Sequence, residues 1–186
     1  DMGMSTAEID YLSQVTNHVV GLPENKGGSG DPSPVTAYGV YMGMKAAAKF
    51  TYGSDSLNGL TVLVQGLGNV GKQLIPLLST EGVKIKVSDI FDDKIKAVSK
   101  FNVKVVNPEH LFEEKIDIYA PCALGASIND LSLESMDCKI IAGSANNQLA
   151  DEKRHGQLLT EKGVIYAPDY LINAGGLINC YQDLIG

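Results

Sequence analysis

The stretch TVLVQGLGNVG, residues 61–71, decides the fold of this chain. The apolar, β-branched run 61–65 predicts a buried strand, and a helix is predicted to begin near Val70. Between them, glycines stand in the spacing Gly-x-Gly-x-x-Gly. Since a chain with 20 Gly in 186 residues produces this spacing by chance, the spacing alone is a weak signal. A strand directly before it and a helix directly after it are the context of a dinucleotide-binding turn.

Each glycine of this turn has a predicted physical role. Gly66 permits a tight turn, Gly68 lets the backbone approach a pyrophosphate, and Gly71 lets the helix and the strand pack closely. The unpaired N–H groups at the helix N-terminus favour a bound phosphate. The candidate cofactor-binding residues of the turn are Gly66, Leu67, Gly68, Asn69, Val70 and Gly71.

An acidic residue follows at the distance that a ribose-binding carboxylate requires. Asp89 stands 18 residues after Gly71, at the end of the second predicted strand. A carboxylate there accepts hydrogen bonds from both ribose hydroxyls and repels a 2′-phosphate. Its neighbours Ser88, Ile90 and Phe91 offer no cation to a 2′-phosphate, so the sequence predicts NAD rather than NADP, with Asp89 and Ile90 at the cofactor.

Outward from the turn, short apolar runs alternate with segments of helix-forming residues. Strands are predicted at residues 61–65, 84–88, 103–106, 116–120, 139–142 and 164–167. Helices are predicted at residues 35–50, 70–81, 92–101, 131–136, 151–162 and 170–184. Strands that alternate with helices form a parallel sheet covered on both faces. The sequence therefore predicts an α/β fold, a Rossmann-type doubly wound sheet of about six strands in the order 3-2-1-4-5-6 with flanking helices.

The N-terminal part has a different character. Ser5 and Glu8 fit a capping box, and apolar residues at helical spacing predict an amphipathic helix over residues 6–19. Residues 21–34, rich in Gly and Pro, predict a loop. We expect a domain boundary there, with residues 1–34 separate from a dinucleotide-binding domain at 35–186.

Composition excludes several classes of function. The formal net charge of −7 argues against a non-specific nucleic-acid or anionic-membrane binder. No apolar run approaches the length of a membrane span, and no signal peptide is visible, so we expect a cytoplasmic protein. The three cysteines are too scattered for a disulfide framework, and the three histidines stand at no metal-ligand spacing, so no metal site is expected.

Three polar loops follow predicted strands, where ligands of open α/β sheets bind. They are residues 120–125, 143–148 and 173–176. Thr36, in the first turn of a predicted helix, is either a helix-capping residue or a ligand contact. Cys122 has no base beside it, which favours a packed thiol over a nucleophile.

Five motifs together resemble a known family. They are GSGDPSPVTAYGVYMGMKAAAK (28–49), VLVQGLGNVG (62–71), APCALGA (120–126), IAGSANNQL (141–149) and APDYLINAGGLIN (167–179). In this order they resemble the amino-acid dehydrogenases that act on glutamate, leucine, phenylalanine and valine. The resemblance implies the reversible, NAD-dependent oxidative deamination of an L-amino acid to the 2-oxo acid and ammonia.

The resemblance also assigns roles near the N-terminus. Asp1-Met2-Gly3 matches a family motif whose aspartate moves protons in catalysis, which makes Asp1 the candidate catalytic residue. The family's substrate-binding and catalytic lysines precede this motif, and no lysine here has the matching context. We therefore expect residues 1–34 to be the end of a substrate domain with its linker, and the chain alone to bind NAD but to be inactive.

Further residues carry over one by one from the family. Thr36 matches the residue that holds the nicotinamide carboxamide, and Asn147 the one that reaches the substrate carboxylate. The other cofactor neighbours implied are Ala120, Pro121, Cys122, Ala145 and Asn146. Leu177 and Cys180 match positions that line the substrate side-chain pocket, and their apolar character disfavours glutamate.

The resemblance implies L-leucine and other branched-chain amino acids as substrates, with phenylalanine or valine as alternatives. It implies a homo-oligomeric full-length protein with no nucleic-acid or membrane partner. A non-catalytic NAD-sensing module is the alternative class of function. That alternative explains the glycine turn and Asp89 but leaves Thr36, Asn147 and residues 173–176 without a role.

Overall fold

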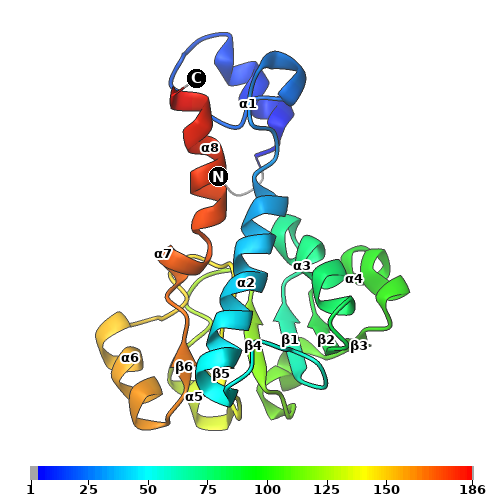
Figure 1. Ribbon diagram of the computed structural model, residues 1–186, viewed down its shortest axis with the longest axis vertical. Helices are drawn as coiled ribbons and strands as arrows, with labels where there is room; N and C mark the ends of the chain where they lie inside the picture. Colours follow the sequence, from blue (N-terminus) through cyan, green and yellow to red (C-terminus); the bar gives the residue numbers. More distant parts are fainter. Residues whose placement is uncertain (1–3, 186) are drawn as a thin grey trace.

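A computed structural model describes residues 4–185 of the chain, and of Ile185 only the backbone (Figure 1). Its centre is a six-stranded parallel sheet in the order β3-β2-β1-β4-β5-β6. The predicted doubly wound fold and strand order are thus confirmed. The strands are β1 Thr61–Gln65, β2 Lys84–Ser88, β3 Lys104–Val105, β4 Ile118–Pro121, β5 Ile140–Ile141 and β6 Ile165–Tyr166.

Helices connect the strands and continue at both ends of the chain. The α-helices are α1 Thr6–Ser13, α2 Ser33–Tyr52, α3 Asn69–Ser79, α4 Asp92–Val98, α5 Asp130–Ser135, α6 Glu152–Glu161, α7 Asp169–Ile172 and α8 Ala174–Ile185. Short 3₁₀ helices lie at Glu24–Lys26, Ser99–Phe101 and Pro108–Glu113. None of the helices in residues 4–185 combines the length and the apolar character of a membrane span.

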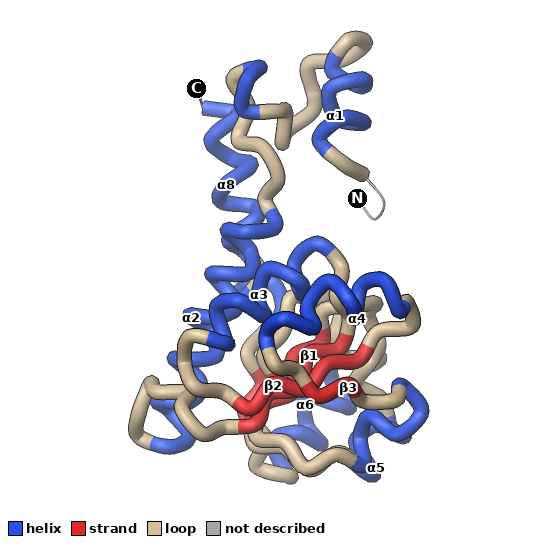
Figure 2. The backbone as a smooth tube through the Cα atoms, turned by 90° about the vertical axis from the view of Figure 1, so that its right-hand side faces the viewer, coloured by secondary structure: helices blue, strands red, loops and turns tan. Residues whose placement is uncertain are grey.

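The alternation of side chains along the strands produces a hydrophobic core on each face of the sheet. Val62 and Val64 of β1 pack with α2, α3 and α4 on one face, whereas Leu63 packs with α5, α6 and the third 3₁₀ helix on the other. Figure 2 shows these helices above and below the strands. Burial on both faces explains why the strands appear in the sequence as continuous apolar runs.

Two predicted helices differ from the observed ones. The helix predicted over residues 6–19 ends at Ser13, and α1 has no buried residue, although its predicted capping box is present. Beyond it, the Thr16 hydroxyl accepts from the His18 N–H, a local bond that competes with the helix. The helix predicted over residues 170–184 is divided into α7 and α8 at Asn173.

The N-terminal segment projects from the sheet together with the C-terminal half of α8 (Figure 1). Asp183 of α8 accepts hydrogen bonds from the Gly21 N–H at 2.6 Å and from the Ser29 hydroxyl at 3.1 Å. The Asn179 side-chain amide donates to the Ser29 carbonyl at 3.3 Å. Residues 21–29 therefore lie along α8 rather than on the sheet.

Helix α2 is tied to the segment just after α3 by a polar cluster. The Tyr41 hydroxyl donates to the Glu81 carboxylate, and Lys45 Nζ lies 3.0 Å from Glu81 Oε1. The bond from Tyr41 and the ion pair with Lys45 lower the pKa of the Glu81 carboxyl below its usual value. This cluster therefore holds the C-terminal end of α3 beside α2.

Candidate functional site

The loops predicted to bind a ligand meet at one edge of the sheet. In parallel strands all carboxyl ends point the same way, so the segments after β1, β2, β4 and β5 lie on this edge. The strand order reverses between β1 and β4, which is where ligands of this architecture bind. The candidate residues after these four strands are therefore brought to one edge.

Two glycines of the turn are required by the fold itself. Gly66 has φ +94°, and a Cβ there would lie 2.7 Å from the Ala123 Cβ. A Cβ on Gly71 would lie 2.0 Å from the Gly66 carbonyl oxygen. Close contact with the segment after β4 therefore excludes a larger residue at Gly66, and close packing of the first turn of α3 against the end of β1 excludes one at Gly71.

Gly68 differs from them, because nothing in the described structure requires a glycine there. Its φ of −68° suits any residue, and a Cβ would meet no heavy atom within 4 Å. Gly68 is also the N-cap of α3, and no side chain caps that helix. The first N–H groups of α3 thus have no side-chain cap and lie beside a backbone without a side chain, an arrangement that fits a pyrophosphate.

Asp89 is joined to the same turn. The Leu67 N–H donates to its Oδ2 at 2.7 Å, and the Phe91 N–H donates to its Oδ1 at 3.0 Å. Each carboxylate oxygen keeps a second lone pair for another donor. The side chain of Ile90, beside it, is 78% exposed and does not belong to the core. The carboxylate and an apolar side chain therefore lie next to the glycine turn.

The end of β4 lies next to the end of β1 at this edge of the sheet. Ala120 and Pro121 are buried, and the Cys122 N–H donates to the Gln65 carbonyl at 2.8 Å. Burial raises the pKa of the Cys122 thiol, so the thiol stays protonated at neutral pH. This agrees with a packed thiol rather than a nucleophile.

The loop after β5 carries Ala145, Asn146 and Asn147. The Ala145 N–H donates to the Pro121 carbonyl at 2.9 Å, and the Asn147 carbonyl accepts from the Ala126 N–H at 2.7 Å. Ala145 is buried, whereas both asparagines are exposed, and Asn147 has φ +51°. The backbone of this loop is thus fixed while two amide side chains are exposed.

Thr36 lies where α2 meets α8. Its hydroxyl donates to the Pro32 carbonyl at 2.9 Å, and a Cβ on Gly176 would lie 2.5 Å from that hydroxyl oxygen. A Cβ on Gly175 would lie 2.7 Å from the Val35 carbonyl oxygen. The two glycines therefore let α8 cross the first turn of α2 closely, with Thr36 buried in the contact.

Two of the remaining candidates lie on α8. Leu177 is 75% exposed on α8. Cys180, one turn further, is half-buried, and burial raises its pKa. The expected catalytic residue Asp1 lies outside the described residues.

Two amides of the predicted segments 143–148 and 173–176, neither of which was assigned a role of its own, connect these parts. The Asn173 side-chain N–H donates to Asn146 Oδ1 at 2.6 Å and to the Ser144 carbonyl at 3.2 Å. Gln148, fully buried, donates to the Gly143 and Ala145 carbonyls. The signal for Gln148 in the sequence is an amide within a loop that follows a strand. Asn173 lies between α7 and α8, and residues 174–176, predicted to be a loop after a strand, belong to α8.

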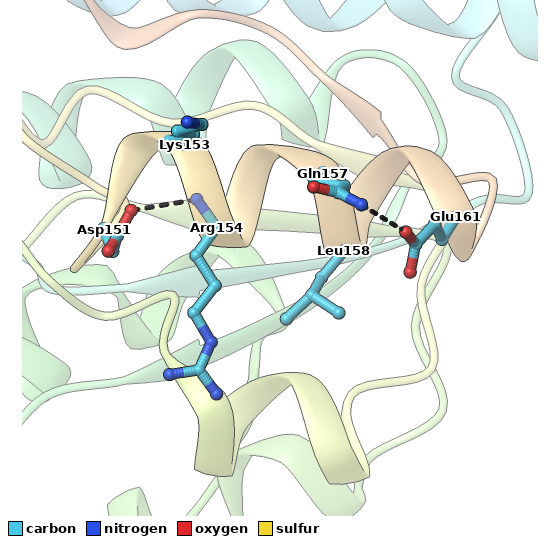
Figure 3. A pocket seen from close by; sticks show the side chains of 6 residues that line it. All are labelled: Asp151, Lys153, Arg154, Gln157, Leu158 and Glu161. Carbon is cyan, nitrogen blue, oxygen red and sulfur yellow. Dashed lines mark hydrogen bonds between the residues drawn. The ribbon is translucent and has the colours of Figure 1, made fainter.

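Two surface hollows lie elsewhere. The first follows one side of α6 (Figure 3), and Arg154 in it pairs with Asp130 at 2.8 Å. The second is an apolar hollow between α2 and the connection from β6 to α7. Neither contains the polar loops of the sheet edge. Within residues 4–185, no group of three His, Cys, Asp or Glu side chains gathers as a metal site would require.

Comparison with known proteins decides the family. The sequence profile described as Glutamate/Leucine/Phenylalanine/Valine dehydrogenase matches residues 27–92 and 86–185. The chain belongs to this dehydrogenase family. Together the two matched segments contain every edge loop described above.

Relatives in this dehydrogenase family match the whole chain. It is 51% identical over 187 residues to a leucine dehydrogenase of Thermoactinomyces intermedius and 49% identical to that of Bacillus subtilis, covering 100% of this chain and 51% of each relative. The crystal structure of L-tryptophan dehydrogenase from Nostoc punctiforme superposes with a TM-score of 0.85 at 42% identity, over 100% of this chain and 53% of that one. The chain therefore spans about half the length of these relatives.

Proposed function

We propose that this chain is the cofactor-binding part of an NAD-dependent amino-acid dehydrogenase that acts on L-leucine and similar branched-chain amino acids. The observation that carries the proposal is the open space at Gly68. Gly66 and Gly71 are explained by packing, whereas Gly68 leaves room beside an uncapped helix N-terminus. A pyrophosphate needs that room and those N–H groups.

The preference for NAD over NADP rests on Asp89. Its carboxylate is held by two backbone N–H groups at the turn, where it would accept from the ribose hydroxyls and repel a 2′-phosphate. The nearby Lys94 ammonium lies 4.5 Å from the centroid of the Phe91 ring. An ammonium over an aromatic ring keeps its charge, so the proposed preference rests on the carboxylate of Asp89 and not on the position of Lys94.

The chemistry proposed is removal of hydride from the amino-acid Cα. NAD, when bound, accepts that hydride at the nicotinamide ring. On this chain, Ala145, Asn146 and Thr36 would orient the nicotinamide half, and Asn147 would hold the substrate carboxylate. Ala120, Pro121 and Cys122 would line the adenosine half. Asp1 would move protons.

The apolar side chains of Leu177 and Cys180 support an apolar substrate, since neither offers a cation to a second carboxylate. The relatives named for leucine and tryptophan agree with an apolar amino acid. A pocket formed by such side chains separates substrates of similar shape weakly, because one methylene contributes only ~1–3 kcal/mol.

We further propose that residues 1–34 belong to the end of a second, substrate-binding domain. In support, α1 has no buried residue, and residues 21–29 lie along the projecting α8 rather than on the sheet. The lysines that the family uses for catalysis have no counterpart in this sequence. The 186 residues would then bind NAD without turnover.

Calorimetric titration of the chain with NAD, and separately with NADP, tests the proposal. We expect saturable binding of NAD and much weaker binding of NADP. Incubation of the same chain with NAD and L-leucine should give no increase in absorbance at the wavelength of NADH. Absence of NAD binding would refute the cofactor role, and equal binding of NADP would refute the role of Asp89.

A further inference from the structure

We infer that Gln148 is a positioning residue, because its side chain sets the path of the loop that carries Ala145, Asn146 and Asn147. Through that path it determines how tightly the loop binds the nicotinamide half of the cofactor. This inference rests on the proposed cofactor binding. It concerns a side chain that would touch neither cofactor nor substrate.

The first observation is the set of bonds made by the Gln148 amide. Nε2 donates to the Gly143 carbonyl and to the Ala145 carbonyl, each at 2.9 Å. An amide nitrogen carries two protons, so both are used. The reverse orientation would place Oε1 against two carbonyl oxygens, which fixes the assignment chemically. One side chain thus clamps the loop by hydrogen bonds at two positions. The second of these positions is Ala145, and Asn146 and Asn147 follow directly after it.

The second observation is that the backbone of Gln148 is anchored on both sides. Its N–H donates to Asp169 Oδ2 at the start of α7, at 3.2 Å. Its carbonyl accepts from the Ile128 N–H at 3.0 Å, in the segment after β4. The clamp is therefore attached to the two elements that flank the loop, rather than moving with it.

The third observation is an incomplete set of partners in a fully buried side chain. Gln148 is 0% exposed, and within the described residues its Oε1 has no hydrogen-bond partner. A buried oxygen without a partner costs free energy. An apolar residue of similar size would avoid that cost but would provide no donor to the loop. The two donated bonds are the chemical feature that distinguishes Gln148 from such a residue.

Other contacts also hold this loop, among them the bond from the Ala145 N–H to the Pro121 carbonyl and the bonds from the Asn173 amide, but they act at other points of the loop. A Cβ on Gly143 would lie 2.2 Å from the Pro121 carbonyl oxygen, so the loop begins in close contact with β4. That contact fixes where the loop starts. The Gln148 amide fixes the direction in which it continues to Asn146 and Asn147.

Gln148→Met tests the inference, because methionine keeps the length of the side chain and removes both donors. Leu159→Met, equally buried on α6 but away from the loop, is the matched control. Two ligands separate the halves of the site: ADP, measured by calorimetry, probes the adenosine and pyrophosphate half, and NADH, measured by its own fluorescence, also probes the nicotinamide half.

In the unaltered chain, we expect NADH emission to increase on binding. In Gln148→Met, the ADP dissociation constant should stay within about twofold. NADH binding should weaken about tenfold and the gain in emission should decrease, as expected when a displaced loop no longer makes its hydrogen bonds to the nicotinamide end of the ligand. Leu159→Met should bind both ligands as the unaltered chain does.

Several results would overturn the inference. Equal weakening for ADP and NADH would show that Gln148 supports the whole domain, and unchanged NADH binding would show that the loop does not need the clamp. If Gln148→Met does not fold, Gln148→Asn, whose shorter amide cannot span the same distance, is measured in its place. Loss of folding in both variants would make Gln148 a residue of the core.

The unaltered chain separates this inference from the proposal on which it rests. If it binds neither ligand, the cofactor role fails, and the inference fails with it. If it binds both but NADH emission does not change, the cofactor role stands, and the inference that this loop holds the nicotinamide is wrong.

Discussion

Replacement of Gly68 by alanine should separate ligand binding from folding. In the folded chain the new methyl group would meet no heavy atom within 4 Å. Alanine is a poorer N-cap than glycine by several tenths of a kcal/mol. It also lowers the entropy of the unfolded chain, which stabilises the folded state by ~0.4–1 kcal/mol. These effects have opposite sign, so the free energy of unfolding should change by less than about 1 kcal/mol.

The same methyl group should strongly weaken NAD binding. It would occupy the space through which the α3 N–H groups reach a phosphate. Loss of two hydrogen bonds to a charged oxygen, at ~1.5–3 kcal/mol each, corresponds to at least about a hundredfold increase in the dissociation constant. Calorimetric titration with NAD, together with thermal unfolding of the unliganded chain, measures both quantities.

Gly71→Ala is the matched comparison, because its Cβ would lie 2.0 Å from the Gly66 carbonyl oxygen. Overpacking of this kind costs ~1–3 kcal/mol, and each kcal/mol lowers the melting temperature of a domain this size by about 2–4 °C. If Gly68→Ala binds NAD normally, the turn does not hold a pyrophosphate. If it melts as low as Gly71→Ala, the space at Gly68 is not open.

Three further predictions concern other parts of the chain. Asp89→Ala should weaken NAD binding more than NADP binding, and equal losses in parallel titrations would show that Asp89 does not select the cofactor. Glu81→Gln should lower stability by ~0.5–1 kcal/mol at pH 7. Folding lowers the pKa of the Glu81 carboxyl below 4.5. The difference in stability between Glu81→Gln and the unaltered chain should therefore disappear as the pH falls through the pKa of Glu81 in the folded chain, which denaturant titrations at a series of pH values measure. Gly176→Ala should lower the melting temperature, and it should lower it less in a Thr36→Ala background, since the clash is with the Thr36 hydroxyl. Gly175→Ala, whose methyl group clashes with a backbone carbonyl, should lower the melting temperature equally in both backgrounds.

The strand order could be predicted from the sequence because it depends on local patterns. Each buried strand is a short apolar run, and each run is followed by a helical segment, so the right-handed crossover leaves few topologies. The observed sheet has the predicted order. The glycine turn was predictable for the same reason, since strand, turn and helix are adjacent in sequence.

Element ends that depend on contacts between distant residues were not predictable in the same way. The pattern that favours one helix over residues 170–184 contains no helix-breaking residue at Asn173. The break coincides with bonds from the Asn173 amide to Ser144 and Asn146. A local reading of apolar spacing contains no information about a partner 27 residues away.

The arrangement of the edge loops shows why the candidate site was only partly visible in the sequence. A series of hydrogen bonds crosses the edge from the glycine turn to α8, and its links are Gly66 N–H to Ser88 O, Cys122 N–H to Gln65 O, Ala145 N–H to Pro121 O, and Asn173 Nδ2 to Asn146 Oδ1. The first three links are between backbone groups, which every residue except proline can donate and every residue can accept. Residue types therefore do not reveal them. Only the last link, and the clamp by Gln148, depend on a particular side chain, so these two amides are where substitution should move the loops without changing the sheet.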